Sequence, residues 1–315
     1  MNPGVHSGLA MDNYLLLPAL SASVICTLLN ECPAAARHSS YLNAEHVRET
    51  SDESDAGSIA HSILLEGSMD CVAIIDPNDH PTKSTGNIPN GWTNNSIRAA
   101  RDEARAAGKI PVLPHDIALI NAMVDSAQAY IESLRETEPA IWAAFQPDGG
   151  DSELTCLWDD GGQLCRMRPD RISKDRRVII DPKFTKRSAE PDSWSRSQVG
   201  PMGYRITAST YRRGAKALFG TLPDYIFLVV EQEPPHLCSM IGMDPENIAF
   251  GDEQVEQGIS QWRRCVAENR WPAYPLKVCY PEVQAWEVSR WQERQGIGER
   301  GIPYDVSKLF ERTDA

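Results

Sequence analysis

The chain has 315 residues, of which 41% are hydrophobic and 24% charged, and its formal net charge is -13. This length suits one large α/β domain or two small ones, and the even spread of apolar and aromatic residues excludes a chain dominated by disorder. No apolar run reaches about 18 residues, so we expect no membrane-spanning helix and no membrane partner.

The start of the chain bears on its location. We expect residues 1–13 to form a flexible N-terminus. The stretch from Tyr14 to Leu29 superficially resembles an export signal, but it contains Pro18, and the first basic residue of the chain is Arg37. The eight cysteines form no CxxC pair. Together these features predict a cytoplasmic protein with free thiols.

Helices dominate the predictions for the first half. A helix begins at Ser21, an N-cap residue, and ends before Pro33. A second covers about 54–65 and is followed by Gly67. Three further segments are predicted, namely a long loop of unassigned role at 76–93 and helices at about 94–107 and 116–136.

Strands enter in the second half. The patterns predict strands at 153–158, 163–172, 178–181, 225–230 and 237–243, and helices around 204–211 and 245–269. Strands flanked by helices on both sides indicate the α/β class, with a mixed central sheet. We therefore expect a single domain over 14–298, with its core at about 150–243, and a flexible C-terminal tail at 299–315.

The acidic total conceals a basic segment. Residues 166–216 contain 14 basic and 5 acidic residues, a net charge of +9, while the remainder carries 17 basic and 39 acidic residues, a net charge of -22. Arginine and lysine bind phosphate, so this segment is a candidate nucleic-acid surface, although an ordinary solvated face would give the same count. The acidic remainder excludes a protein that coats DNA over its whole surface.

One motif in that segment indicates a reaction. Asp170, preceded by proline, is followed after ten residues by Asp181-Pro182-Lys183, the only acid-x-Lys triplet in the chain. The intervening residues form a predicted hairpin that brings the two aspartates together, and the two-residue period of a strand puts Asp181 and Lys183 on one face. Carboxylates bind Mg²⁺, which activates water, and a nearby lysine stabilises a charged phosphorus centre. The pattern favours phosphodiester hydrolysis over a turn aspartate beside a surface ion pair.

The chain resembles the PD-(D/E)xK nuclease superfamily and, within it, the RecE-like phage exonucleases of the exodeoxyribonuclease VIII type. The resemblance covers about residues 14–295 and implies a restriction-endonuclease-like core. The similar segments are Leu20–Ser23 with Cys32–Ala34, Gly57–His61, Gly149–Glu153 with Trp158, Arg168–Asp170, Ile179–Thr185, and Gly203–Tyr204 with Tyr211–Gly214.

The resemblance also implies roles for individual residues. It implies a bound Mg²⁺, for which Mn²⁺ can substitute, and the implied ligands are His61, Glu153, Asp170, Asp181 and the backbone carbonyl of Pro182. The implied catalytic residues are Glu153, Asp170, Asp181, Lys183, which is the catalytic lysine, and Tyr211, which completes the pocket. Each has a structural alternative, such as packing for His61 and Tyr211.

Two positions depart from the family pattern. Thr207 stands where the family usually has glutamine, so either the pocket is reorganised or Gln198 compensates. Pro182 stands where a small aliphatic residue is usual. Proline keeps its carbonyl but lacks an N–H group, which predicts a sheet edge or a bulge at this point.

The function implied by the resemblance is an Mg²⁺-dependent exonuclease that degrades linear double-stranded DNA from its ends, 5′ to 3′, in phage-type recombination. Its implied partners are DNA ends, a single-strand annealing protein and further copies of the chain in a ring, in a bacterial host cell with a phage or prophage gene. Two alternatives remain open. One is a RecB-like or endonucleolytic repair nuclease with the same core, and the other is a catalytically silent DNA-binding or scaffold protein.

Overall fold

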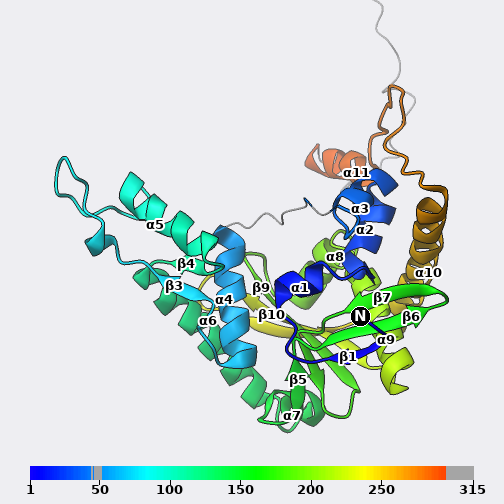
Figure 1. Cartoon of the computed structure of the whole chain (residues 1–315), viewed down its shortest axis with the longest axis horizontal. Helices are drawn as coiled ribbons and strands as arrows, with labels where there is room; N and C mark the ends of the chain where they lie inside the picture. Colours follow the sequence, from blue (N-terminus) through cyan, green and yellow to red (C-terminus); the bar gives the residue numbers. More distant parts are fainter. Residues whose placement is uncertain (44, 46–51, 296–315) are drawn as a thin grey trace, which may run out of the picture. The chain divides into compact units, whose positions relative to one another are not determined.

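The computed structural model describes residues 1–43, 45 and 52–295 (Figure 1). The chain divides into two compact units, Met1–Ala273 and Tyr274–Ala315, and each is described by itself. The predicted domain boundary at 298 therefore lies within the second unit. The predicted flexible tail at 299–315 lies outside the described residues.

A five-stranded sheet forms the centre of the first unit, with the strand order β11-β10-β9-β8-β5. The strands are β5 (Gly150–Ser152), β8 (Arg171–Ser173), β9 (Val178–Thr185), β10 (Asp224–Glu231) and β11 (Cys238–Gly242). Strands β9 and β10 are parallel, and the other neighbours are antiparallel. The sheet is therefore mixed, as predicted.

Both faces of this sheet are buried. Ile179 of β9 and Phe227 of β10 belong to one core cluster, whereas their neighbours Ile180 and Leu228 belong to another. This alternation explains why β9 and β10 read as nearly continuous apolar runs. The longer helices of the first cluster are α2 (Ala22–Asn30), α9 (Tyr204–Phe219) and α10 (Pro245–Glu268), and those of the second are α4 (Asp52–Glu66), α6 (Pro114–Ser133) and α7 (Pro139–Phe145).

A second sheet has the order β1-β6-β7-β2. Its strands are β1 (Gly4–His6), β2 (Leu20–Ser21), β6 (Thr155–Asp160) and β7 (Gln163–Met167). Residues 4–6 pair with β6 as strand β1, and the flexibility of residues 1–13 stays a prediction. The predicted strand 163–172 is corrected: it divides at residues 168–170, where Pro169 lacks an N–H group, into β7 and β8 of different sheets.

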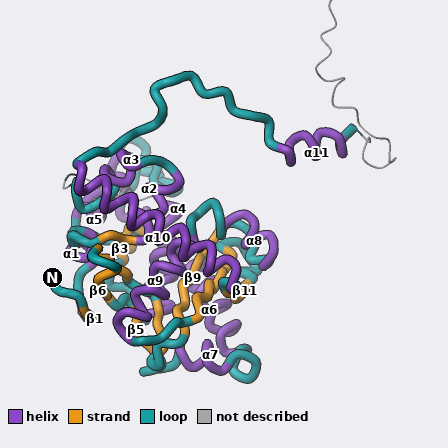
Figure 2. The backbone as a smooth tube through the Cα atoms, turned by 90° about the vertical axis from the view of Figure 1, so that its right-hand side faces the viewer, coloured by secondary structure: helices purple, strands orange, loops and turns teal. Residues whose placement is uncertain are grey.

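The remaining elements of the first unit are shorter. They are α1 (Met11–Leu15), α3 (Pro33–His38), α5 (Asn95–Ala106), α8 (Pro191–Gln198), a 3-10 helix (Pro77–Asp79), and the parallel pair β3 (Val72–Ile74) and β4 (Ile110–Val112). Ser21 caps α2 as predicted, since its hydroxyl accepts a hydrogen bond from the Val24 N–H. Pro33 opens α3, and the segment 76–93 is irregular apart from the 3-10 helix (Figure 2).

The second unit contains α11 (Ala285–Arg294) after an extended segment. Its side chains pack little, and Trp286 and Trp291 are exposed. In the part of the chain that the structure describes, no helix has the length and apolar character needed to cross a membrane.

Close packing of α9 against α10 yields a stability prediction. A Cβ atom on Gly251 would lie 2.5 Å from the Ser209 hydroxyl and 2.6 Å from the Arg205 carbonyl oxygen. We expect Gly251→Ala to lower the free energy of unfolding by about 1–3 kcal/mol through overpacking. Gly57→Ala is the control, because its Cβ would make only an ordinary contact of 3.6 Å with Phe184. Equal melting temperatures for the two variants would contradict the packing assignment.

Candidate active site

The two aspartates of the motif meet at one end of the five-stranded sheet. Strands β8 and β9 form the predicted hairpin, in which Arg171 pairs with Ile180. Asp170 immediately precedes Arg171, and Asp181 immediately follows Ile180, so continuation of the antiparallel register places the aspartates opposite each other. The hairpin prediction is confirmed.

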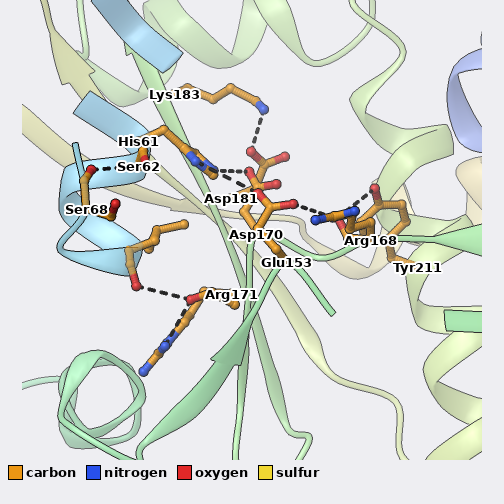
Figure 3. Close-up of polar contacts among 12 residues, drawn as sticks. His61, Ser62, Ser68, Glu153, Arg168, Asp170, Arg171, Asp181, Lys183 and Tyr211 are labelled. Atoms are coloured by element: carbon orange, nitrogen blue, oxygen red, sulfur yellow. Dashed lines mark hydrogen bonds and ion pairs between the residues drawn. The ribbon is translucent and has the colours of Figure 1, made fainter. Parts of the chain in front are cut away.

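Three side chains from separate elements gather beside this hairpin (Figure 3). His61 comes from α4, Glu153 from the link between β5 and β6, and Asp170 from the link between β7 and β8. Their candidate ligand atoms all lie within 4.8 Å of one another. His61 Nε2 lies 3.2 Å from Asp170 Oδ2, and His61 Nδ1 lies 4.0 Å from Glu153 Oε1. Their side chains are 21%, 26% and 20% exposed in the order His61, Asp170, Glu153, so a cation from solvent can reach them.

The backbone and Arg168 hold Glu153 in this group. Glu153 has a φ of 51°, in the left-handed region, and its N–H group donates to the carbonyl oxygen of Asp170 at 3.2 Å. The Arg168 Nε–H group donates to Glu153 Oε2 at 2.6 Å. The unusual φ of a non-glycine residue is therefore fixed by contacts on both sides and aims the carboxylate at His61.

Asp181 and Lys183 form an ion pair on β9 next to this group. Asp181 is only 6% exposed, and its Oδ1 atom faces the Lys183 ammonium group. Its Oδ2 atom accepts a hydrogen bond from the Tyr225 hydroxyl at 2.8 Å. Lys183 also lies over the ring of Tyr204, 5.5 Å from its centroid. Asp181 thus has a partner for each of its oxygens.

The carboxylates differ in acidity because their partners differ. Burial, reinforced by the nearby Asp170 charge, raises the pKa of Asp181 to about 6 despite Lys183. Burial acts the same way on Asp170, but the His61 hydrogen bond and the Lys183 charge outweigh it and lower the pKa of Asp170. Burial and the Asp170 charge raise the pKa of Glu153. Burial opposes the charge of Lys183, but Asp181 and Asp170 outweigh it and raise the pKa of Lys183.

This donor set fits a divalent cation. Three carboxylates and an imidazole face two permanent cations, Lys183 and Arg168, so with a neutral imidazole the ionised carboxylates leave an excess of negative charge. Oxygen-rich ligand sets suit Mg²⁺ and Mn²⁺, and an imidazole is compatible with the latter. His61, Glu153 and Asp170 are the three that lie close enough to share one ion, and Asp181 adjoins them.

The other predicted residues lie around this group. The Tyr211 hydroxyl donates to the carbonyl oxygen of Arg168 at 3.4 Å. Its contact with the acidic group is therefore indirect, where the acidic group means His61, Glu153, Asp170 and Asp181. Pro182 lies on β9, an inner strand between β8 and β10. On the β8 side, pairing covers only Ile179 and Ile180, so β9 has no β8 partner at Pro182. This matches the predicted local edge. Its carbonyl as a metal ligand stays a prediction.

Gln198 does not replace the glutamine absent at position 207. Its amide donates to the carbonyl oxygen and hydroxyl of Ser197, and in the described part of the chain it forms no hydrogen bond with a site residue. The aromatic partners Tyr204 and Tyr225 instead contact Lys183 and Asp181. The motif from Asp170 to Lys183 identifies neither tyrosine, because both reach the site from distant elements. Tyr204 lies in a segment that resembles the family, but no role was expected for it.

Many arginines of the basic segment, residues 166–216, form ion pairs or hydrogen bonds within the protein. Arg168 binds Glu153, Arg176 binds Asp151, and Arg213 binds Asp160. Further internal contacts, mostly to backbone carbonyls, are made by Arg166, Arg171, Arg205 and Arg212. The local net charge of +9 therefore overstates the charge available to DNA.

The acidic surroundings of His61 predict its titration in metal-free protein. Burial lowers the pKa of His61, but the Asp170 hydrogen bond and the charges of Asp170 and Glu153 outweigh it and raise the pKa above its ordinary value. Folding thus favours the imidazolium, and this stabilisation is present at low pH and lost as the pH rises through the folded-state pKa. We expect the NMR titration midpoint of His61 to fall in Asp170→Asn. The control is Asp175→Asn, a change on the exposed turn between β8 and β9, which should leave the midpoint unchanged. An unchanged midpoint in Asp170→Asn would contradict the pairing.

Comparisons with known proteins bear on the fold and the family of the chain. Among solved structures, one described as a "putative exonuclease" from Eubacterium rectale superposes with a TM-score of 0.55 at 13% identity, covering 90% of this chain and 99% of that chain. This likeness supports the fold. A second, SSO0001, reaches a TM-score of only 0.24 at 14% identity, covering 69% of this chain and 96% of that chain. No curated protein matches the chain.

The model of a family described as a PDDEXK-like domain of unknown function (DUF3799) matches residues 21–281. The match includes every residue of the candidate site. The chain belongs to this PDDEXK-like family.

Proposed function

We propose that the protein is a divalent-metal-dependent nuclease, and more narrowly an Mg²⁺-dependent exonuclease of linear double-stranded DNA in the RecE-like manner. The convergence of His61, Glu153 and Asp170 beside the Asp181–Lys183 pair carries this proposal. The PDDEXK-like family and the fold shared with the Eubacterium rectale protein support it.

The proposed metal ligands are His61, Glu153, Asp170, Asp181 and the backbone carbonyl of Pro182. A bound cation supplies neutralising charge at the phosphate and lowers the pKa of a water molecule. Arg168 holds Glu153 in place, and the hydrogen bond between His61 and Asp170 orients both groups. These contacts reduce the rearrangement that binding requires.

Lys183 is the proposed catalytic lysine. It remains protonated, because the neighbouring aspartates raise its pKa. Its side chain is 30% exposed, so the ammonium can reach a DNA phosphate. Fixed there by Asp181 and the Tyr204 ring, it can orient the attacking water and stabilise charge developing on the phosphate.

Cleavage of end-labelled linear duplex DNA in Mg²⁺ tests this assignment. We expect Lys183→Ala and Asp181→Asn to lower the rate by several orders of magnitude and to retain most DNA binding, because these groups act mainly in the transition state. Lys109→Ala, which removes an exposed lysine outside the basic segment, is the matched control. Equal rates in all four proteins would overturn the site. Intact linear DNA with wild-type protein in both Mg²⁺ and Mn²⁺ would favour the silent scaffold.

A neighbouring cavity favours recognition of DNA ends. It measures about 360 Å³ and is lined by Arg166 and by hydroxyl-bearing residues that include Ser21, Ser23 and Tyr41. Arg166 is 5% exposed, and among the described residues its Nε atom has no hydrogen-bond partner and its guanidinium has no carboxylate partner. A buried cation of this kind would gain from a phosphate. Because Arg168 lies two residues further along the chain and binds Glu153, such a phosphate would lie near the proposed metal.

Substrate ends test this part of the proposal. We expect faster degradation of linear duplex with a 5′-phosphate than with a 5′-hydroxyl, and no cutting of closed circular DNA. Ser23→Ala should reduce the preference by about fivefold, the value of roughly one hydrogen bond, whereas Ser133→Ala on α6 should leave it intact. Cutting of closed circles would support the RecB-like or endonucleolytic alternative instead.

The proposed partners rest on the RecE-like resemblance. They are DNA ends, a single-strand annealing protein and further copies of the chain in a ring. A monomeric mass by light scattering in the presence of DNA would contradict the ring.

A further inference from the structure

Tyr225 lies behind the acidic group at a position that the catalytic motif does not include. It belongs to β10, where it pairs in parallel register with Ile179 of β9, two residues before Asp181. Side chains alternate along a strand, so Tyr225 and Asp181 project from the same face of the sheet. The Tyr225 hydroxyl donates to Asp181 Oδ2 at 2.8 Å, and the two residues are only 2% and 6% exposed.

Because of this hydrogen bond, the two Asp181 oxygens have different partners. Oδ2 is held from behind by Tyr225, and Oδ1 faces Lys183. A carboxylate has a broad torsional preference about its last bond, so without the hydroxyl its orientation would be set by the ion pair alone. With both contacts in place, the plane of the carboxylate is fixed and Oδ1 is held against the Lys183 ammonium group.

The Tyr225 ring is itself held rigidly. It meets the Tyr211 ring edge to face, with centroids 5.8 Å apart, and the Phe227 ring at 5.2 Å. Tyr211 in turn donates to the carbonyl oxygen of Arg168, whose side chain binds Glu153. The Tyr211–Tyr225 pair therefore contacts Asp181 through the Tyr225 hydroxyl. Through the Tyr211 hydroxyl it contacts the backbone of Arg168, whose side chain binds Glu153.

We infer that Tyr225 is a positioning residue, which uses its hydroxyl to fix Asp181 for metal binding and for pairing with Lys183. This inference rests on the proposed nuclease function. It assigns no contact between Tyr225 and DNA or metal. The hydroxyl acts through Asp181, and replacing it with hydrogen leaves a buried carboxylate oxygen without its donor.

The test compares Tyr225→Phe with Tyr130→Phe. Both changes remove one hydroxyl and keep the ring, but the Tyr130 hydroxyl accepts a hydrogen bond from the Met240 N–H group, away from the acidic group. The measurements are kcat and KM on linear duplex in Mg²⁺, Mn²⁺ affinity by calorimetry without DNA, and Tm. We expect Tyr225→Phe to lower kcat about tenfold or more with little change in KM, and to weaken Mn²⁺ binding several-fold. Tyr130→Phe should change Tm only.

Each outcome decides the inference. Wild-type kcat and Mn²⁺ affinity in Tyr225→Phe would overturn it, whatever the Tm. Equal losses in both variants would also overturn it, because they would indicate a general structural effect. If wild-type protein cleaves no DNA, the proposed function fails separately. The Mn²⁺ affinities then decide: weakening confined to Tyr225→Phe supports positioning, and unchanged affinity rejects it.

Discussion

A buried carboxylate requires compensating partners, and this requirement at Asp181 organises the site. Asp181 lies within β9, directly after three apolar residues and in a sheet covered on both faces, so its charge cannot be fully hydrated. Lys183 compensates one oxygen and Tyr225 the other. These partners keep the carboxylate in place, but burial and the Asp170 charge still raise its pKa to about 6. A divalent cation would relieve the remaining cost, which gives the site a physical reason to bind one.

The fold brings four separate chain segments to this point. The link between β7 and β8 carries Asp170 from one sheet to the other, and the link between β5 and β6 carries Glu153 beside it. Helix α4 packs on the sheet through Ile59, which is fully buried, while His61 reaches the acidic residues. Lys183 is delivered by β9 itself. Because both faces of the central sheet are covered, the helix and strands that carry or flank the ligands are held rigidly.

The sequence predicted the parts of the site that depend on local order. The hairpin with Asp170 and Asp181, the strand alternation that joins Lys183 to Asp181, and the Ser21 cap all follow from short-range patterns. The resemblance added His61 and Glu153, which the structure brings together with Asp170. Long-range partners left no local signal: Tyr225 approaches from a neighbouring strand, and β1 pairs with a strand about 150 residues away. The net charge counted over residues 166–216 also overestimated the charge available to DNA, because arginines such as Arg213 are paired with carboxylates within the protein.

The position of a bound metal tests the assignment of the site without relying on catalysis. Anomalous scattering from crystals grown with Mn²⁺ would locate the ion without reference to activity. We expect a peak ligated by His61, Glu153 and Asp170 and adjoining Asp181, and loss of that peak in Asp170→Asn. A peak elsewhere on the chain, or none at saturating Mn²⁺, would contradict the assignment.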